Sequence, residues 1–311
     1  MKAIRFTTYG GPAVLELADI ATPAPGPGEA LIRVAATTFN PVDAAIRAGF
    51  LRQEFPLTLP HIPGIDVSGV VTAVGPGVDH ALVSTAVVAF LPMNAPGAAA
   101  EYVVAPAHLL APAPSSVSLV DAAALPSAEL TAWQALVEYA GVHAGSRVLV
   151  NGAGGGVGGF TVGLAKHFGA HVIATASPRS RDAIRAAGAD EIIDYTRTPV
   201  AEAIHEPVDI VINLVRNSDA DLAALREHII DGGALVSTTT PAHPDPGRKV
   251  RADNIFVRSD AHQLANLTSL VDRGALRLDV SNRYPLTDLP HVHTLGERGA
   301  LRGKTVIQIA D

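Results

Sequence analysis

Hydrophobic and polar positions alternate in one regular way through the middle of the chain. Between residues 119 and 261, short apolar runs typical of buried strands are separated by stretches with helical spacing of the apolar residues. Strands are predicted at 148–150, 171–175, 191–195, 208–215, 234–238 and 254–258, and helices at 122–139, 160–168, 182–187 and 220–230. Strands that alternate with helices favour an α/β fold with a parallel, doubly wound sheet.

The first third of the chain has a different pattern. Strands are predicted at 31–38, 66–74, 86–91 and 101–104, and turns rich in proline and glycine separate them. This pattern predicts a compact β barrel or sandwich, with residues 111–116 as an exit linker. Near the C-terminus we predict helices at 262–273 and 288–297 and a last strand at 304–309, which would be able to close the sheet of the first domain.

A glycine-rich turn follows the first strand of the middle region. It has the form Ala153-x-Gly155-x-x-Gly158, an alanine-first version of the dinucleotide fingerprint. Missing side chains allow backbone N–H groups to approach a pyrophosphate, and the N-terminus of the next helix favours its negative charge. Gly169 fits the left-handed position that ends this helix. The alternative is a tight strand-to-helix turn that binds no ligand.

The residues after the second strand indicate which dinucleotide is bound. An NAD site has an acidic residue there for the ribose hydroxyl, whereas this chain has Ser177-Pro178-Arg179-Ser180-Arg181. A hydroxyl and guanidinium groups suit a 2′-phosphate, so we predict NADPH as the cofactor. The alternative is a solvated basic loop before a helix.

Composition narrows the function classes. The 311 residues are 48% hydrophobic and 17% charged, so the chain is long enough for two domains and is not disordered. A net charge of −7 without a basic run disfavours nucleic acid as a partner. We see no signal-peptide core and no apolar stretch long enough to cross a membrane, so we expect a cytoplasmic protein.

Metal chemistry is also disfavoured by composition. The chain has no cysteine, and the only closely paired histidines are His291 and His293, for which we expect a surface or core role. Redox chemistry would therefore depend on an organic cofactor. Asn40-Pro41-Val42-Asp43 begins a short helix that ends near Gly49, and the cap-forming role of Asn40 and a functional role remain equally open.

The order of several segments resembles the zinc-free quinone oxidoreductase (zeta-crystallin-like) branch of the medium-chain dehydrogenase/reductase superfamily. The resemblance covers nearly the whole chain. It depends on Asn40-Pro41-Val42-Asp43-x-x-x-Arg47-x-Gly49, on Pro63-Gly64-Ile65-Asp66-Val67-Ser68-Gly69 in place of a His-Glu metal motif, on Ala100-Glu101-Tyr102-Val103-Val104, on Thr131-Ala132-Trp133-Gln134, on the glycine turn and on Arg302-Gly303-Lys304-Thr305.

The resemblance implies a fold and a set of site residues. A GroES-like β-barrel catalytic domain would comprise residues 1–118 and 262–311, and a Rossmann domain would comprise residues 119–261, with nicotinamide and substrate between them. Asn40 would face the substrate as the catalytic residue. The cofactor would be bound by Thr131, Gly155, Gly156, Val157, Ser177, Arg179, Tyr195, Leu214, Thr238, Phe256 and Val257, and no residue would bind a metal. For Tyr195, local packing at the end of a strand is an equally good interpretation.

Two segments depart from the family pattern. Asn213-Leu214-Val215-Arg216-Asn217 stands where the family often has Asp-Thr-Val-Gly-Gly, and Phe50 stands where it often has a tyrosine. The missing hydroxyl leaves the proton source unassigned.

We therefore expect zinc-independent hydride transfer from NADPH to a quinone or an α,β-unsaturated carbonyl, by a homodimer that pairs through an edge of the nucleotide sheet. The Asn40 amide would stabilise the charge that develops on the acceptor. Two alternatives remain open. One is an enoyl-thioester or enoyl-intermediate reductase of a biosynthetic pathway, and the other is an NADPH-binding protein with a regulatory or structural role.

Overall fold

The computed structural model describes residues 1–309 and divides into two compact units. Unit 1 contains Met1–Ser127, Ser259–Asp272 and the chain from Val280 onward, and unit 2 contains Ala128–Arg258 and Arg273–Asp279. The sequence placed the first boundary at 118/119, whereas the units divide between Ser127 and Ala128.

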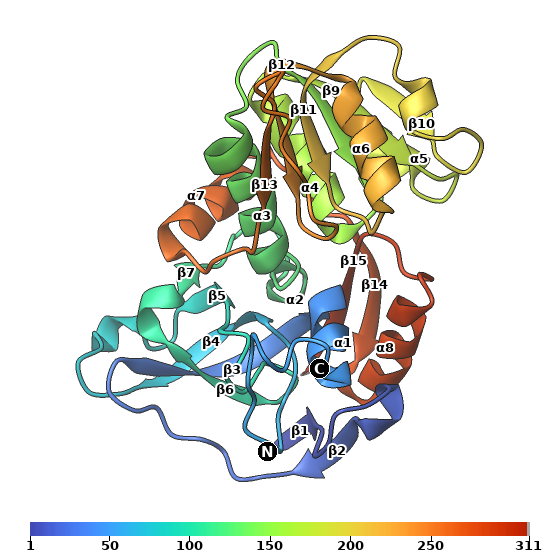
Figure 1. Ribbon diagram of the computed structural model, residues 1–311. Helices are drawn as coiled ribbons and strands as arrows, with labels where there is room; N and C mark the ends of the chain where they lie inside the picture. The colour runs from blue at the N-terminus through green and yellow to red at the C-terminus, as the bar shows by residue number, and fades with distance from the viewer. Residues whose placement is uncertain (310–311) are drawn as a thin grey trace. The chain divides into compact units, whose positions relative to one another are not determined.

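Unit 2 is built on a six-stranded sheet with the order β10-β9-β8-β11-β12-β13, in which all neighbouring strands are parallel (Figure 1). The predicted parallel, doubly wound α/β sheet is confirmed. The strands are β8 (Arg147–Asn151), β9 (His171–Ala176), β10 (Glu191–Asp194), β11 (Val208–Asn213), β12 (Ile229–Ser237) and β13 (Arg251–Asn254). The helical segments are α3 (Pro126–Trp133), which begins in unit 1, the π-helical η4 (Gln134–Ala140), α4 (Gly156–His167), α5 (Arg181–Ala186), the 3₁₀ turn η5 (Ala201–Ala203) and α6 (Asp219–Glu227).

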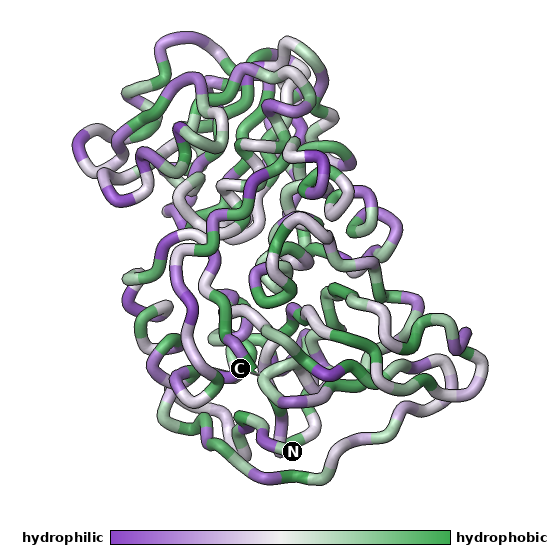
Figure 2. Tube along the Cα trace, turned by 180° about the vertical axis from the view of Figure 1, so that it is seen from behind, coloured by the Kyte–Doolittle hydropathy of each residue, from purple (hydrophilic) through white to green (hydrophobic). Residues whose placement is uncertain are grey.

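The core of unit 2 explains why these strands are so apolar. Leu149, Val211 and Ile229 are fully buried, as expected for a parallel sheet covered by helices. Helix α4 packs on β8 and β9, and α6 packs on β12. In the hydropathy view, short hydrophobic segments alternate with hydrophilic ones along the chain (Figure 2).

Unit 1 contains a mostly antiparallel sheet with the order β14-β15-β3-β4-β5-β7, and β6 also pairs with β3. Its strands are β3 (Glu29–Phe39), β4 (Asp66–Val74), β5 (Ala86–Phe90), β6 (Tyr102–Pro106), β7 (Ala111–Pro112), β14 (Val280–Pro285) and β15 (Lys304–Gln308), and β1 (Lys2–Arg5) pairs separately with β2 (Glu16–Asp19). Its helices are α1 (Pro41–Ala48), α2 (Leu119–Ala122), α7 (Ala261–Asp272) and α8 (Leu289–Glu297), with 3₁₀ turns η1 (Pro12–Val14), η2 (His80–Leu82), η3 (Ala107–Leu109) and η6 (Leu286–Asp288). The C-terminal strand β15 pairs with β3, which confirms that it joins the sheet of the first domain.

The predicted helix at 122–139 is wrong as a single element. The chain forms α2, a turn, α3 and then η4. The break has a local cause, because Pro126 has no N–H to continue a helix and its ring disfavours helical geometry at the preceding residue. Proline is instead well suited to the first turn of α3.

Other boundaries were also misplaced. Residues 229–230, predicted as the end of a helix, begin β12, which continues through Gly232 and Gly233. Gly232 has φ +82°, and a side chain on Gly233 would lie 2.5 Å from the Asp209 carbonyl oxygen, so these glycines serve the sheet rather than a helix end. Strand β13 lies at 251–254 rather than at 254–258, and residues 111–112 of the predicted linker pair with β5.

Candidate cofactor and active site

In the glycine turn between β8 and α4, one glycine has space for a side chain and another has none. A Cβ atom on Gly158 would lie 2.4 Å from Ala153 Cα and from the Gly152 carbonyl oxygen, so the fold itself requires glycine there. Gly155, the N-cap of α4, is exposed, and its Cβ would meet nothing nearer than 3.5 Å. Its φ of −85° and ψ of 175° suit any residue. Neither packing nor backbone conformation therefore explains glycine at 155.

Most of the other predicted cofactor residues follow the carboxyl ends of parallel strands in unit 2. These ends lie along one edge of the sheet, where ligands of open α/β folds bind. Ser177 follows β9, Tyr195 follows β10, Leu214 follows β11, Thr238 follows β12, and Phe256 and Val257 lie just beyond β13. Tyr195 and Phe256 are 52% and 58% exposed, so neither ring is used as core packing.

The turn after β9 contacts the glycine turn directly. Ser180 N donates to the Ser177 carbonyl oxygen over 3.0 Å, and a side chain on Gly154 would lie 2.6 Å from Ser180 Oγ. Arg179 is exposed in this turn, whereas Arg181 lies 3.4 Å from the Asp194 carboxylate. The hydroxyl of Ser180 and the guanidinium group of Arg179 therefore belong to the turn that adjoins the glycine turn.

Residues 213–217, which depart from the family pattern in sequence, have a structural role. Asn213 is fully buried, and its amide accepts a bond of 2.9 Å from Asn151 Nδ2 and donates to the Val215 carbonyl oxygen over 2.9 Å and to Ser237 Oγ over 3.1 Å. These bonds join the carboxyl ends of β8, β11 and β12. Val215 and Leu214 lie against Gly152, so this loop borders the glycine turn despite its different sequence.

Thr131 lies on α3 and is 8% exposed. Gln134, the residue that follows this helix, was not singled out by sequence reasoning. Gln134 is buried, its Oε1 accepts from Arg258 N over 3.1 Å, and its Nε2 donates to the Arg258 carbonyl oxygen over 3.0 Å. This pair of bonds fixes the segment that carries Phe256 and Val257. The Thr-Ala-Trp-Gln sequence was the only signal available for it.

In unit 1, Asn40 is surrounded by a buried polar cluster, which we call the Lys304 cluster. Its members are Thr38, Asn40, Asp66, Ser127 and Lys304. Lys304 Nζ lies 2.8 Å from Asn40 Oδ1 and 3.1 Å from Asp66 Oδ2, and Asp66 Oδ1 accepts from Ser127 N over 2.7 Å. Burial alone would raise the pKa of Asp66, but the Lys304 ammonium and the bonds from Thr38, Asn40 and Ser127 hold it below its ordinary value.

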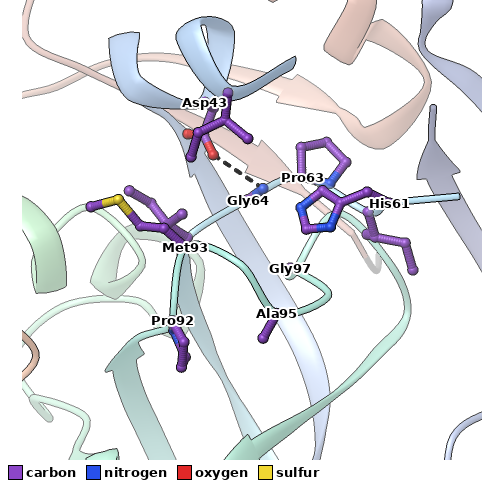
Figure 3. A pocket seen from close by; sticks show the side chains of 11 residues that line it. Asp43, His61, Pro63, Gly64, Pro92, Met93, Ala95 and Gly97 are labelled. Carbon is purple, nitrogen blue, oxygen red and sulfur yellow. Dashed lines mark hydrogen bonds between the residues drawn. The ribbon is translucent and has the colours of Figure 1, made fainter. Parts of the chain in front are cut away.

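Asp43 lines a small pocket of unit 1 next to this cluster. Its Oδ2 accepts from Asn40 N over 3.0 Å. Its Oδ1 accepts from Gly64 N over 3.2 Å, and this bond is drawn in Figure 3. His61, Pro92 and Met93 are among the mostly apolar residues that line the same pocket. Burial, together with the Asp66 charge, raises the pKa of Asp43 to about 7.

This pKa predicts a pH dependence of folding stability. Because Asp43 binds its proton more tightly in the folded than in the unfolded chain, its stabilising contribution is full below pH 4 and is lost as the pH rises towards 7. Relative to Asp43→Asn, the wild-type free energy of unfolding should fall by roughly 4 kcal/mol across that window. Urea unfolding at several pH values measures this difference, and a difference that stays constant with pH would contradict the assignment.

Comparisons with known proteins agree with this geometry. Residues 26–115 match the alcohol dehydrogenase GroES-like domain, and residues 187–307 match the zinc-binding dehydrogenase model. An Arabidopsis thaliana chloroplast envelope quinone oxidoreductase homolog is 31% identical over 330 residues, which cover 99% of this chain and 98% of that protein. The chain belongs to the medium-chain dehydrogenase/reductase superfamily, in its quinone oxidoreductase branch.

Two further relatives illustrate the superfamily. The Arabidopsis thaliana NADPH-dependent alkenal/one oxidoreductase is 33% identical over 319 residues, which cover 99% of this chain and 79% of that protein. The structure of the quinone oxidoreductase from Coxiella burnetii matches with a TM-score of 0.89 and 33% identity, and it covers 100% of this chain and 99% of its own. The protein is accordingly an oxidoreductase of the medium-chain dehydrogenase/reductase type that uses a nicotinamide cofactor.

The description of one of the matching models mentions zinc. Within residues 1–309, no three His, Cys, Asp or Glu side chains come together in an arrangement suited to a metal ion. Asp66, in the segment that takes the place of a metal motif, is bound by Lys304 instead. No helix in the described part of the chain is long and apolar enough to span a membrane.

Proposed function

We propose that the protein reduces a quinone or an α,β-unsaturated carbonyl with NADPH and without zinc. The observation that supports this proposal is the carboxyl edge of the unit 2 sheet, where the open Gly155 position adjoins a turn with Ser177 and Arg179 and no acidic residue. NADPH, when bound, would supply the hydride. The names of the quinone and alkenal/one oxidoreductase relatives support the acceptor class.

The residues of this chain would bind and orient the reactants. We assign the pyrophosphate to the backbone of Gly155, Gly156 and Val157, and the 2′-phosphate to Ser177, Arg179 and Tyr195. Leu214 would contact the adenosine end, and the remaining contacts would come from Thr131, Thr238, Phe256 and Val257 near the nicotinamide.

Asn40 would act on the acceptor. One amide hydrogen of Asn40 is held by Asp66 Oδ2 at 3.0 Å, whereas the other points to Thr38 Oγ1 over a longer distance of 3.2 Å. Thr38 Oγ1 also accepts from Lys304, so the second amide hydrogen is the one more easily redirected to an acceptor oxygen. Such a donor would stabilise the negative charge that develops as hydride is transferred.

The function is tested by following the loss of NADPH absorbance with a panel of quinones, enals, enones and enoyl thioesters. Oxidation with quinones or enones supports the proposal. Oxidation with enoyl thioesters alone would favour a biosynthetic enoyl reductase, and binding of NADPH without oxidation by any acceptor would favour a regulatory role.

The cofactor preference has its own prediction. Arg179→Ala should weaken NADPH binding about 10- to 100-fold and NADH binding by less than about 2-fold, because charge-assisted bonds to the phosphate are lost only with NADPH. Dissociation constants for both cofactors measure this effect. Arg181→Ala is the matched control, since Arg181 faces Asp194 and its removal should affect both cofactors alike. Equal weakening of both cofactors by Arg179→Ala would contradict the phosphate assignment.

We also propose a cytoplasmic homodimer. Strand β13 pairs only with β12 among the described strands, so one edge of the unit 2 sheet has backbone groups available for a second copy. Light scattering of the purified protein tests the stoichiometry, and cell fractionation tests the location.

A further inference from the structure

Lys304 is a buried ammonium group whose bonds are all made inside the Lys304 cluster. The residue is 4% exposed on β15, next to Thr38 on the paired strand β3. Its Nζ donates to Asn40 Oδ1 over 2.8 Å, to Thr38 Oγ1 over 3.0 Å and to Asp66 Oδ2 over 3.1 Å. An ammonium has three N–H groups, so the three acceptors use all of them.

These contacts determine the orientation of the Asn40 amide. An ammonium only donates and an ionised carboxylate only accepts, so Oδ1 must face Lys304 and Nδ2 must face Asp66. The reverse orientation would place Nδ2 against the ammonium and Oδ1 against the carboxylate, and both bonds would become repulsive.

The backbone of Asn40 has a separate role that does not orient the amide. Asn40 is the N-cap of α1, and the Asp43 carboxylate bonds to its backbone N–H over 3.0 Å. The cap explains why the chain turns into a helix at this point. It does not explain a buried lysine, supplied from more than two hundred residues further along the chain, at the side-chain oxygen.

We propose that Lys304 is a positioning residue that holds the Asn40 amide so that its N–H group, and not its carbonyl oxygen, faces the reducible acceptor. The ammonium charge at Oδ1 also polarises the amide, which makes its N–H a stronger donor. This inference rests on the proposed role of Asn40 in the reduction. Without Lys304 the oxygen of the amide loses its charged donor, and only the Asp66 and Thr38 acceptors at Nδ2 still hold the orientation. An amide turned the other way would present its carbonyl oxygen and repel a developing oxyanion.

A purely structural role makes a different prediction. If Lys304 serves only to neutralise Asp66, removing one charge should lower both the thermal stability and kcat, because it leaves the other charge buried and unpaired. Removing both charges together should then restore both quantities. The double variant Asp66→Asn/Lys304→Met separates the two roles when it is compared with Asp66→Asn, because Asp66→Asn alone also removes a partner of the Asn40 amide. Lys304→Met alone also leaves Asp66 unpaired, so its folding is checked by thermal melting.

The kinetic test is a double-mutant cycle between Asn40→Ala and Lys304→Met, measured with an acceptor from the screen. We expect Asp66→Asn/Lys304→Met to regain thermal stability over Lys304→Met, yet to keep a kcat about 10- to 100-fold below wild type with NADPH affinity within about 2-fold. In the Asn40→Ala background, Lys304→Met should cause little further loss, because it acts through Asn40. Lys304→Arg should restore part of kcat.

A readout independent of turnover follows the Asn40 amide itself. In protein labelled with ¹⁵N-asparagine, the Asn40 side-chain signal is identified by its loss in Asn40→Ala. Its hydrogen exchange should accelerate about 10-fold or more in Asp66→Asn/Lys304→Met, since the bonds that fix the amide are gone. Unchanged exchange, a wild-type kcat in the double charge variant, or multiplying losses in the cycle would overturn the inference. Absence of NADPH oxidation by the wild type would instead refute the proposed function, and the exchange result would still decide the role of Lys304.

Discussion

Replacing Gly155 by valine is expected to weaken NADPH binding at least about 100-fold while the free energy of unfolding changes by less than about 1 kcal/mol. The backbone at Gly155 is extended, with φ −85° and ψ 175°, and valine adopts such angles readily. The first side-chain carbon would meet only the Gly152 carbonyl oxygen, at 3.5 Å. The new methyl groups therefore occupy the space that we assign to the pyrophosphate, and the protein itself needs no adjustment. Titration calorimetry with NADPH, together with urea unfolding, measures both quantities.

The control for this variant lies in the same turn. Gly158→Ala places a Cβ atom 2.4 Å from backbone atoms of Gly152 and Ala153, so the strand-to-helix turn must shift and folding stability should fall by about 3 kcal/mol. The two variants separate a glycine required by the ligand from one required by the fold. Normal NADPH affinity in Gly155→Val would remove the main support for the cofactor site.

Local signals in the sequence were sufficient for the elements that carry this site. Gly49 and Gly169, expected to end helices, have φ of +83° and +79°. The strand, glycine turn and helix at 147–167 are determined by residues that are close together in the sequence. The apolar run and the glycine spacing were therefore enough to predict them. Apart from Thr131 on α3, the predicted cofactor residues follow strand ends, because a parallel sheet brings all these ends to one edge.

Residues that meet across long sequence separations escaped prediction. Asp66 and Lys304 are 238 residues apart, and Arg47 and His293 are 246 apart, so no local pattern connects them. Strand β13 was misplaced for a related reason. Its sequence, Arg-Ala-Asp-Asn, lacks an apolar run, because it lies at an edge of the sheet and pairs with β12 alone.

His293 shows how the structure distinguishes alternatives that the sequence left open. The sequence favoured a surface or core role for His291 and His293 over metal binding. His293 has a core role: it is 1% exposed and packs edge-on against Phe39, with the ring centroids 4.9 Å apart. Burial and the adjacent Arg47 lower the pKa of His293 to about 3, so the ring is neutral near pH 7. A neutral ring accepts a hydrogen bond at Nδ1, and Arg47 Nη1 lies 3.1 Å from that atom.

Arg47→Met should therefore lower the free energy of unfolding by about 3–5 kcal/mol. Arg47 has no exposed surface, and besides His293 its guanidinium bonds to the Gly10 carbonyl oxygen over 3.0 Å and to Glu297. Methionine replaces the packing of the stem but leaves these acceptors without their donor, and for the buried His293 no water can take its place. Urea unfolding at pH 7 measures the change.

Glu297→Gln provides the matched control for this prediction. The Glu297 side chain is 39% exposed, so water weakens the ion pair that its charge makes with Arg47. Glu297→Gln should therefore lower the free energy of unfolding by less than about 1 kcal/mol. Arg47→Lys should lie close to Arg47→Met, because one ammonium group cannot reach three acceptors arranged for a planar fork. If Arg47→Met were as stable as Glu297→Gln, the buried guanidinium would not be what joins α1 to α8 and to the segment that carries Gly10.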